Sequence, residues 1–158
     1  MDEQPEIEIR PIEPEEYETA AELIKGSLGE YDAFDFDPNT SDLAPERMED
    51  LYEEPKGRLW VAEANDSLVG TIGLRRVDDR ACKLTRLWVH PDYRRYDVAQ
   101  QLETTLADYA REAGFRRLIT QTTTRQEPAA AFLGSAGYAE FKRTLVEKTV
   151  VITFEKTL

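Results

Sequence analysis

Apolar and polar residues alternate in some segments of this chain and recur at helical spacing in others. Residues 6–12 alternate and predict a half-buried strand. Residues 14–28 gather apolar side chains on one helical face, and Pro14 suits a first helical turn. Residues 45–53 predict a short second helix. The acidic and aromatic segment between them, residues 31–42, predicts a loop.

Two strands are expected next, at residues 58–64 and 68–77. The tight-turn composition of residues 65–67, Asn-Asp-Ser, joins them into a hairpin. Gly70 and Gly73 lie inside the second strand, where they either weaken it or let another backbone come close.

The strand that begins at Cys82 changes its inward face midway. Cys82 and Leu84 are apolar at even positions, and Leu87 and Val89 are apolar at odd positions. A change of parity inside a strand usually marks an extra residue, because side chains alternate between the two faces. We therefore expect a β-bulge at residues 85–86.

The remaining pattern completes a mixed α/β fold of one domain, residues 1–158. The strand at residues 82–90 leads through a turn into a helix that Gly114 closes in a left-handed conformation. A second short helix is expected to close at Gly134. These later segments are the turn 91–97, the helix 98–113, the strand 117–123, the helix 128–133 and two antiparallel strands, 138–145 and 149–154.

Composition narrows the classes of function. The 158 residues include 41% hydrophobic ones, enough for a core, and 20 Lys and Arg against 32 Asp and Glu give a net charge of −12. That sign argues against nucleic acid and against an anionic membrane surface as partners. The dispersed acids favour a halophile-type acidic surface over the alternative, attraction of a cationic substrate.

Single residues exclude further classes. Cys82 is the one cysteine and His90 the one histidine, so the sequence offers no internal disulfide, no Cys-rich site and no His pair, and no metal is expected. Residues 1–8 are acidic and polar, unlike a signal peptide. No apolar run reaches the length of a membrane span. We expect a cytoplasmic protein.

The turn at residues 91–97 carries the clearest chemical signal. A strand that enters a helix through a basic turn presents unpaired helical N–H groups and the positive end of the helix dipole. Arg94 and Arg95 add charge and forked donors, which suits a pyrophosphate. The alternative is that both arginines are solvated or paired with neighbouring acids.

Residues 84–102, LTRLWVHPDYRRYDVAQQL, resemble the acetyl-CoA-binding motif of the GCN5-related N-acetyltransferases (GNAT). That motif reads apolar-x-V-x-P-x-x-R/Q-x-x-G-x-G/A and precedes an amphipathic helix. Residues 114–118 and the Ala-rich run 130–138 resemble later parts of the family pattern, so the likeness covers nearly the whole chain. It implies the GNAT fold, a central and mostly antiparallel mixed sheet flanked by helices, with acetyl-CoA as co-substrate.

The same resemblance implies a set of cofactor-binding residues. The bulged strand would present its backbone to the pantetheine arm, with the Val89 N–H polarising the thioester carbonyl. The amides of the following turn would cradle the pyrophosphate. The residues concerned are Leu87, Trp88, Val89, Arg94, Arg95, Tyr96, Asp97, Val98 and Ala99.

Two positions depart from the family pattern. Asp97 replaces the first turn glycine, where its carboxylate would repel a diphosphate or cap the helix in a D-x-x-Q box with Gln100. Leu133 occupies the place of the tyrosine that many members use to protonate the leaving thiolate. Tyr138 is expected to be a core residue rather than that acid.

No glutamate lies on the strand 82–90 to act as base. Glu63 on the hairpin is a weak candidate that would act through water, against the simpler interpretation of a solvated strand face. His90 is expected near the cofactor or at the surface rather than as the base. Cys82 is expected to be a small buried hydrophobe, not a nucleophile.

These observations favour an N-acetyltransferase in which a primary amine of a small molecule or peptide attacks acetyl-CoA directly. The alternative is a GNAT-fold binding or interaction module with weakened catalysis, which Asp97 and Leu133 support. The loop 31–42 could receive a cationic amine or be an ordinary acidic loop, and a homodimer stays open. The loop residues in question are Asp32, Phe34, Asp35, Phe36 and Asp37.

Overall fold

A computed structural model describes residues 5–30, 44–124 and 127–158. Within these ranges seven strands form one sheet in the order β1-β2-β3-β4-β5-β7-β6. Neighbouring strands are antiparallel except β4 and β5, which are parallel. The mixed, mostly antiparallel sheet expected from the sequence is therefore confirmed.

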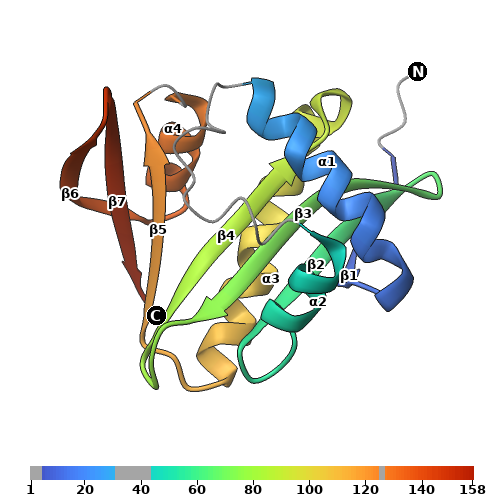
Figure 1. The fold of residues 1–158 in the computed structure, drawn as a ribbon, viewed down its shortest axis with the longest axis horizontal. Helices are drawn as coiled ribbons and strands as arrows, with labels where there is room; N and C mark the ends of the chain where they lie inside the picture. Colours follow the sequence, from blue (N-terminus) through green and yellow to red (C-terminus); the bar gives the residue numbers. More distant parts are fainter. Residues whose placement is uncertain (1–4, 31–43, 125–126) are drawn as a thin grey trace.

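Helices cover both faces of this sheet. Helices α1 and α2 lie on one face, and α3 and α4 lie on the other (Figure 1). The strands are β1 (Glu8–Pro11), β2 (Gly57–Ala64), β3 (Ser67–Arg76), β4 (Ala81–Val89), β5 (Arg117–Thr123), β6 (Ala139–Val146) and β7 (Thr149–Thr157). The helices are η1 (Pro14–Glu16), α1 (Tyr17–Glu30), α2 (Pro45–Leu51), η3 (Pro91–Tyr96), α3 (Val98–Glu112) and α4 (Glu127–Ser135).

The larger core lies between the sheet and helices α3 and α4. Helix α3 supplies Val98, Leu102 and Leu106, all fully buried and spaced so that they share one helical face. That face ends at the buried Ala110, and Ala113, the last residue of the expected helix, is exposed. A smaller core of Tyr17, Ala21, Ile24, Met48, Tyr52 and Leu59 joins α1 and α2 to the other face.

Local turn chemistry explains how the elements are joined. Asn65 and Asp66 both have positive φ, 51° and 63°, as a two-residue hairpin turn requires. Gly114 ends α3 at φ 94°, as expected. The helix expected to close at Gly134 instead runs to Ser135, and Gly137, at φ 96°, is the left-handed residue that follows it. The N-terminal strand is also shorter than expected, because only Glu8–Pro11 pair with β2.

Gly70 and Gly73 permit close approaches, as their place inside β3 predicts. A Cβ on Gly70 would lie 3.1 Å from Leu102 of α3 and from the Trp88 carbonyl oxygen. A Cβ on Gly73 would lie 2.6 Å from the Tyr52 ring. The first glycine lets α3 sit close to the sheet, and the second makes room for Tyr52 on the opposite face.

We expect Gly73→Ala to lower the free energy of unfolding by about 1–3 kcal/mol, because the new methyl group would overlap the Tyr52 ring. Gly26 in α1 is the matched control, since nothing lies within 4 Å of its Cβ position. Gly26→Ala should raise stability by up to about 1 kcal/mol through helix propensity. Denaturant unfolding of both variants checks the pair, and equal effects would show that Gly73 is not sterically required.

Candidate functional site

The β-bulge expected in β4 is present. Thr71 of β3 lies opposite Trp88, but Gly73 lies opposite Thr85, so β4 has one residue more than β3 over this stretch. Arg86 lies in the extra stretch and has φ 53°, the only positive φ among the described residues of β4. The bulge switches which side chains face the core, as the change of parity in the sequence predicted.

Two contacts hold the bulge in place, and neither was foreseen from the sequence. The Thr71 hydroxyl donates a 2.8 Å hydrogen bond to the Arg86 carbonyl, and Thr71 is fully buried. On the α2 side, the hydroxyls of Tyr52 and Thr85 are hydrogen-bonded at 2.7 Å. The position of Thr71 between two strand glycines, opposite the change of parity, is the signal that could have identified it.

Beyond the bulge, β4 separates from β5. The two strands pair only over Ala81–Lys83 and Arg117–Ile119, and they then diverge toward the end of β4 that leads to η3 (Figure 1). Where the divergence begins, the Thr120 hydroxyl donates a 3.0 Å hydrogen bond to the Leu84 carbonyl. The edge of β4 that faces β5 is therefore left without ladder partners over its second half.

Strand alternation decides which amides this edge presents. The His90 N–H bonds to the Val69 carbonyl, so it points toward β3. Successive residues direct their N–H groups to opposite sides, so the amides of Leu87 and Val89 point to the edge that faces β5. The backbone of Trp88 faces β3, and its side chain is buried. Of the three residues expected to meet a pantetheine arm, Leu87 and Val89 have their N–H groups on the divergent edge.

Asp97 joins η3 to α3 in the left-handed conformation, at φ 59° and ψ 26°. Its side chain makes no capping hydrogen bond, so the capping box with Gln100, one of the two roles considered for Asp97, is not formed. A left-handed residue does not direct its carboxylate at the helical amides as an extended N-cap does. The first amides of α3, including those of Val98 and Ala99, therefore have no cap from Asp97 and no intrahelical acceptor.

The two turn arginines contact their own turn. Arg94 donates from Nε to the Val89 carbonyl at 3.0 Å, which ties the end of β4 to η3. Arg95 bonds to the Tyr96 hydroxyl at 2.7 Å, and its guanidinium lies 4.9 Å from the centre of that ring. Both arginines thus hold positive charge beside the start of α3 while bracing the turn.

His90 follows β4 and stacks edge-on between Trp88 and Tyr93. Its Nδ1 accepts a 3.1 Å hydrogen bond from the Asp92 N–H. In the neutral ring the proton then lies on Nε2, so neither nitrogen is an available base in this arrangement.

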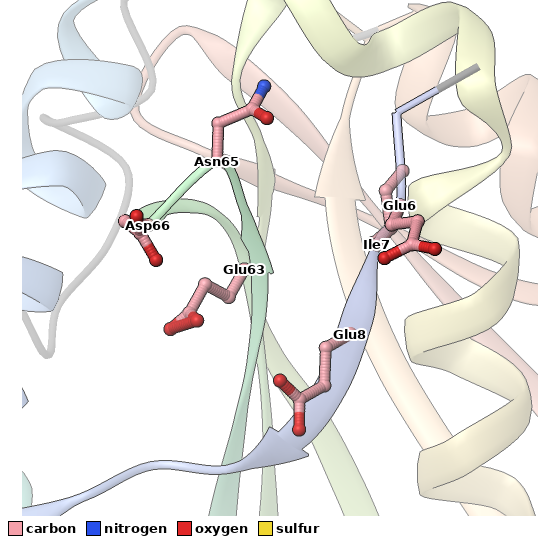
Figure 2. Close-up of a pocket in the computed structure, with 6 residues that line it drawn as sticks. All are labelled: Glu6, Ile7, Glu8, Glu63, Asn65 and Asp66. Carbon is pink, nitrogen blue, oxygen red and sulfur yellow. The ribbon is translucent and has the colours of Figure 1, made fainter. Parts of the chain in front are cut away.

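Glu63 lies on β2, with β3 between it and β4. Arg10 donates to its carboxylate at 2.7 Å and also binds Glu16, which raises the pKa of the Arg10 guanidinium. A groove of about 680 Å³ opens beside Glu63 at the β1–β2 edge (Figure 2). Its lining is strongly acidic and consists of Glu6, Ile7, Glu8, Glu63, Asn65 and Asp66.

Leu133 and Tyr138 are both buried in the larger core, Leu133 at 4% and Tyr138 at 5% exposure. The Tyr138 hydroxyl donates to Glu103 at 3.2 Å, and Lys156 binds the same carboxylate oxygen at 2.7 Å. Burial, with the nearby Glu103 charge, raises the pKa of the Tyr138 phenol. The expectation that Tyr138 is a core residue is confirmed.

Cys82 is fully buried, and burial raises the pKa of its thiol to about 12. A protonated, inaccessible thiol is a packing residue, in line with the expectation. Among the described residues, no group of three or more His, Cys, Asp or Glu could hold a metal ion. The acidic loop expected to receive the acceptor, residues 31–42, lies outside the described ranges.

Sequence comparisons place the chain among acetyltransferases. The model of the acetyltransferase (GNAT) family matches residues 27–138. N-acetyltransferase 8 of Homo sapiens is 36% identical over 90 residues, which cover 54% of this chain and 38% of that protein. The uncharacterized N-acetyltransferase YjgM of Escherichia coli is 28% identical over 105 residues, which cover 65% and 60%. The chain thus spans less than two thirds of the length of these relatives.

Solved structures share the fold. A GNAT-family acetyltransferase from Staphylococcus aureus superposes with a TM-score of 0.84 at 23% identity, covering 97% of this chain and 99% of that one. The PaiA N-acetyltransferase from Thermoplasma acidophilum, crystallised with coenzyme A, gives 0.81 at 17% identity, covering 97% and 99%. Because the family model matches most of the chain, this protein belongs to the GNAT acetyltransferase family.

We expect Lys156→Met to lower the free energy of unfolding by about 3–5 kcal/mol, because Glu103 would keep a buried charge without its cation. Glu103→Leu combined with Lys156→Met should recover most of that loss, since no charge is then buried. Arg111→Met, which breaks an exposed pair with Asp108, is the control and should cost at most about 1 kcal/mol. Chemical denaturation checks the series. A Lys156→Met loss as small as that of Arg111→Met would contradict a buried ion pair.

Proposed function

We propose that this protein is an acetyl-CoA-dependent N-acetyltransferase in which a primary amine attacks the thioester directly, with both substrates bound. The observation that carries the proposal is the edge of β4. There the amides of Leu87 and Val89 point to the edge of β4 that faces β5, beyond the place where the two strands stop pairing. An extended arm that carries amide groups could pair with this edge as a further strand does.

The start of α3 would hold the pyrophosphate of the same molecule. Its first amides receive no cap from Asp97, the helix dipole favours an anion there, and Ala99 is small enough for close approach. Arg94 and Arg95 add positive charge beside these amides. Because η3 is braced to β4 through Arg94 and Val89, the two parts of the site keep a fixed spacing.

Acetyl-CoA supplies the acyl thioester, and the chain orients it. The Val89 N–H would donate to the thioester carbonyl, where negative charge develops as the amine attacks. Leu133 offers no proton to the departing thiolate, and a thiol with a pKa near 8.5 can leave without one at some cost in rate. Arg10 occupies the Glu63 carboxylate, and β3 lies between Glu63 and β4, so we expect the amine to arrive neutral rather than to lose its proton to Glu63.

The acceptor would be a small-molecule or peptide amine. The net charge of −12 and the acidic groove beside Glu63 favour approach of a cationic molecule to this part of the surface. The second candidate function is a binding module of the same fold, which the apolar, buried Leu133 at the acid position favours. Clear binding of CoA without turnover of any amine would select that alternative.

Calorimetric titration with acetyl-CoA, followed by a panel of amines, tests the proposal. We expect one molecule to bind per chain, and a structure of that complex should place the diphosphate against the first turn of α3. A diphosphate far from this turn would overturn the assignment. Failure to bind acetyl-CoA at any salt concentration would overturn the function itself.

Asp97 should limit the affinity for CoA through charge repulsion. We expect Asp97→Gly to tighten binding most at low ionic strength, where repulsion is least screened. Asp97→Asn is the matched control, because it removes the charge and Asn tolerates the left-handed conformation. Titration of both variants in dilute and in molar KCl checks this. If Asn has no effect while Gly tightens binding at every salt concentration, backbone strain rather than charge is the cause.

Turnover should rise with pH as the acceptor amine loses its proton. The midpoint should approach about 10.4 for a lysine-like amine or about 8 for an α-amine, provided the amine is unperturbed. Tyr138→Phe should keep this profile and most of the rate, because the phenol is buried against Glu103. Rates are to be measured beside melting temperatures. A large loss of turnover in a Tyr138→Phe protein of unchanged stability would show that Tyr138 is the acid after all.

A further inference from the structure

Strand β6 lies at one edge of the sheet, far from the β1–β2 edge (Figure 1). Every residue of β6 is exposed. Three of them are large and apolar: Phe141 is 49% exposed, Leu145 69% and Val146 43%. An edge strand of this kind is a template for pairing with another strand, and apolar side chains strengthen that tendency.

Charge at this edge differs from charge over the rest of the chain. Strand β6 itself carries Lys142 and Arg143 against Glu140, a net charge of +1 on a chain of net charge −12. Two copies that meet through β6 therefore avoid the repulsion expected between strongly acidic surfaces. Because this edge is close to neutral, a second copy of the chain can meet it, and no partner of opposite net charge is needed.

The register of β6 sets the arrangement of its charges. Glu140 lies opposite Phe154, and Arg143 lies opposite Ile152. Phe154 and Ile152 both face the larger core, so Glu140 and Arg143 point to the same face although they are three residues apart. The register shift between Glu140 and Lys142 adds one residue, Phe141, to β6, so two side chains three residues apart can point to the same face. Within one chain, Arg143 binds Glu140.

Only some two-fold arrangements of two β6 strands place opposite charges across from each other on the same face. In an antiparallel pair, residues directly opposite each other point to the same face. A two-fold axis normal to the sheet, placed between Phe141 and Lys142, sets Glu140 opposite Arg143 of the second copy, and the reverse. Each copy then meets the other with opposite charges on matching faces. Centring the axis on Lys142 would instead set the two Lys142 residues against each other.

We propose that β6 is a homodimer interface, at which the β6 strands of two copies pair antiparallel and exchange the Glu140–Arg143 ion pairs. The two sheets then continue into one another. Phe141 lies inside the paired stretch, residues 139–144, and loses exposure there, which adds a hydrophobic contribution to the backbone hydrogen bonds, while Leu145 and Val146 lie just beyond it. This inference goes beyond the proposed function, because it involves neither the β4 edge nor the start of α3.

Sedimentation velocity over a wide range of protein concentration tests the proposal. We expect the unmodified chain to dimerise. Glu140→Arg alone, and Arg143→Glu alone, should each be monomeric, because like charges then face each other twice across the axis. An equimolar mixture of the two variants should form a heterodimer, since both cross-strand pairs are again of opposite sign. The chain that carries both substitutions should dimerise with itself.

Arg111→Glu is the matched control, because Arg111 forms a similar exposed pair with Asp108 on α3. It should leave the dimer intact, and circular dichroism should show that all variants stay folded. A monomeric unmodified chain at every concentration would overturn the proposal. A dimer that neither single substitution weakens, or two monomeric variants that do not associate when mixed, would equally overturn it.

Discussion

The hydrogen bond from the Thr71 hydroxyl to the Arg86 carbonyl fixes the one irregular point on which the site depends. It occurs where β4 has one residue more than β3. The carbonyl that accepts it belongs to Arg86, which has no partner residue in the β3–β4 ladder. After this point the inward and outward faces of β4 are exchanged. Val89 turns into the core, and the amides of Leu87 and Val89 turn to the divergent edge. Without the extra residue, Leu87 and Val89 would have the opposite parity, so their side chains would leave this core and their amides would point toward β3.

Helix α3 is coupled to the same irregularity through Gly70. The absent side chain lets Leu102 and Val98 pack against the strand beside the Trp88 carbonyl. This packing fixes the distance between the start of α3 and the end of β4. Arg94 adds a hydrogen bond from η3 to Val89. The edge amides and the helical amides therefore form one rigid arrangement. Such fixed donors stabilise developing charge without reorganising during the reaction.

Much of this arrangement could be predicted from the sequence, because it depends on local patterns. The parity change from Leu84 to Leu87 located the bulge, and Gly114 located the end of α3. What could not be predicted depends on backbone conformation or on distant partners. The sequence D-x-x-Q at Asp97 suited a cap, but the left-handed backbone turned the carboxylate away. Glu103 and Lys156 are 53 residues apart, and no local pattern indicates that they meet in the core.

In the proposed reaction, the surroundings of Tyr138 would leave catalysis mainly to the backbone. A phenol whose pKa is raised by burial and by Glu103 is a poorer acid than a free tyrosine, and its proton already points to Glu103. Leu133, at the other position, has no proton to give. The leaving thiolate in the proposed reaction would then depart at its own basicity, which a thiol can do far more readily than an alkoxide. The barrier of the proposed reaction would be lowered mainly by how the chain holds the thioester carbonyl and the amine, so the geometry of β4 would matter more than any single side chain.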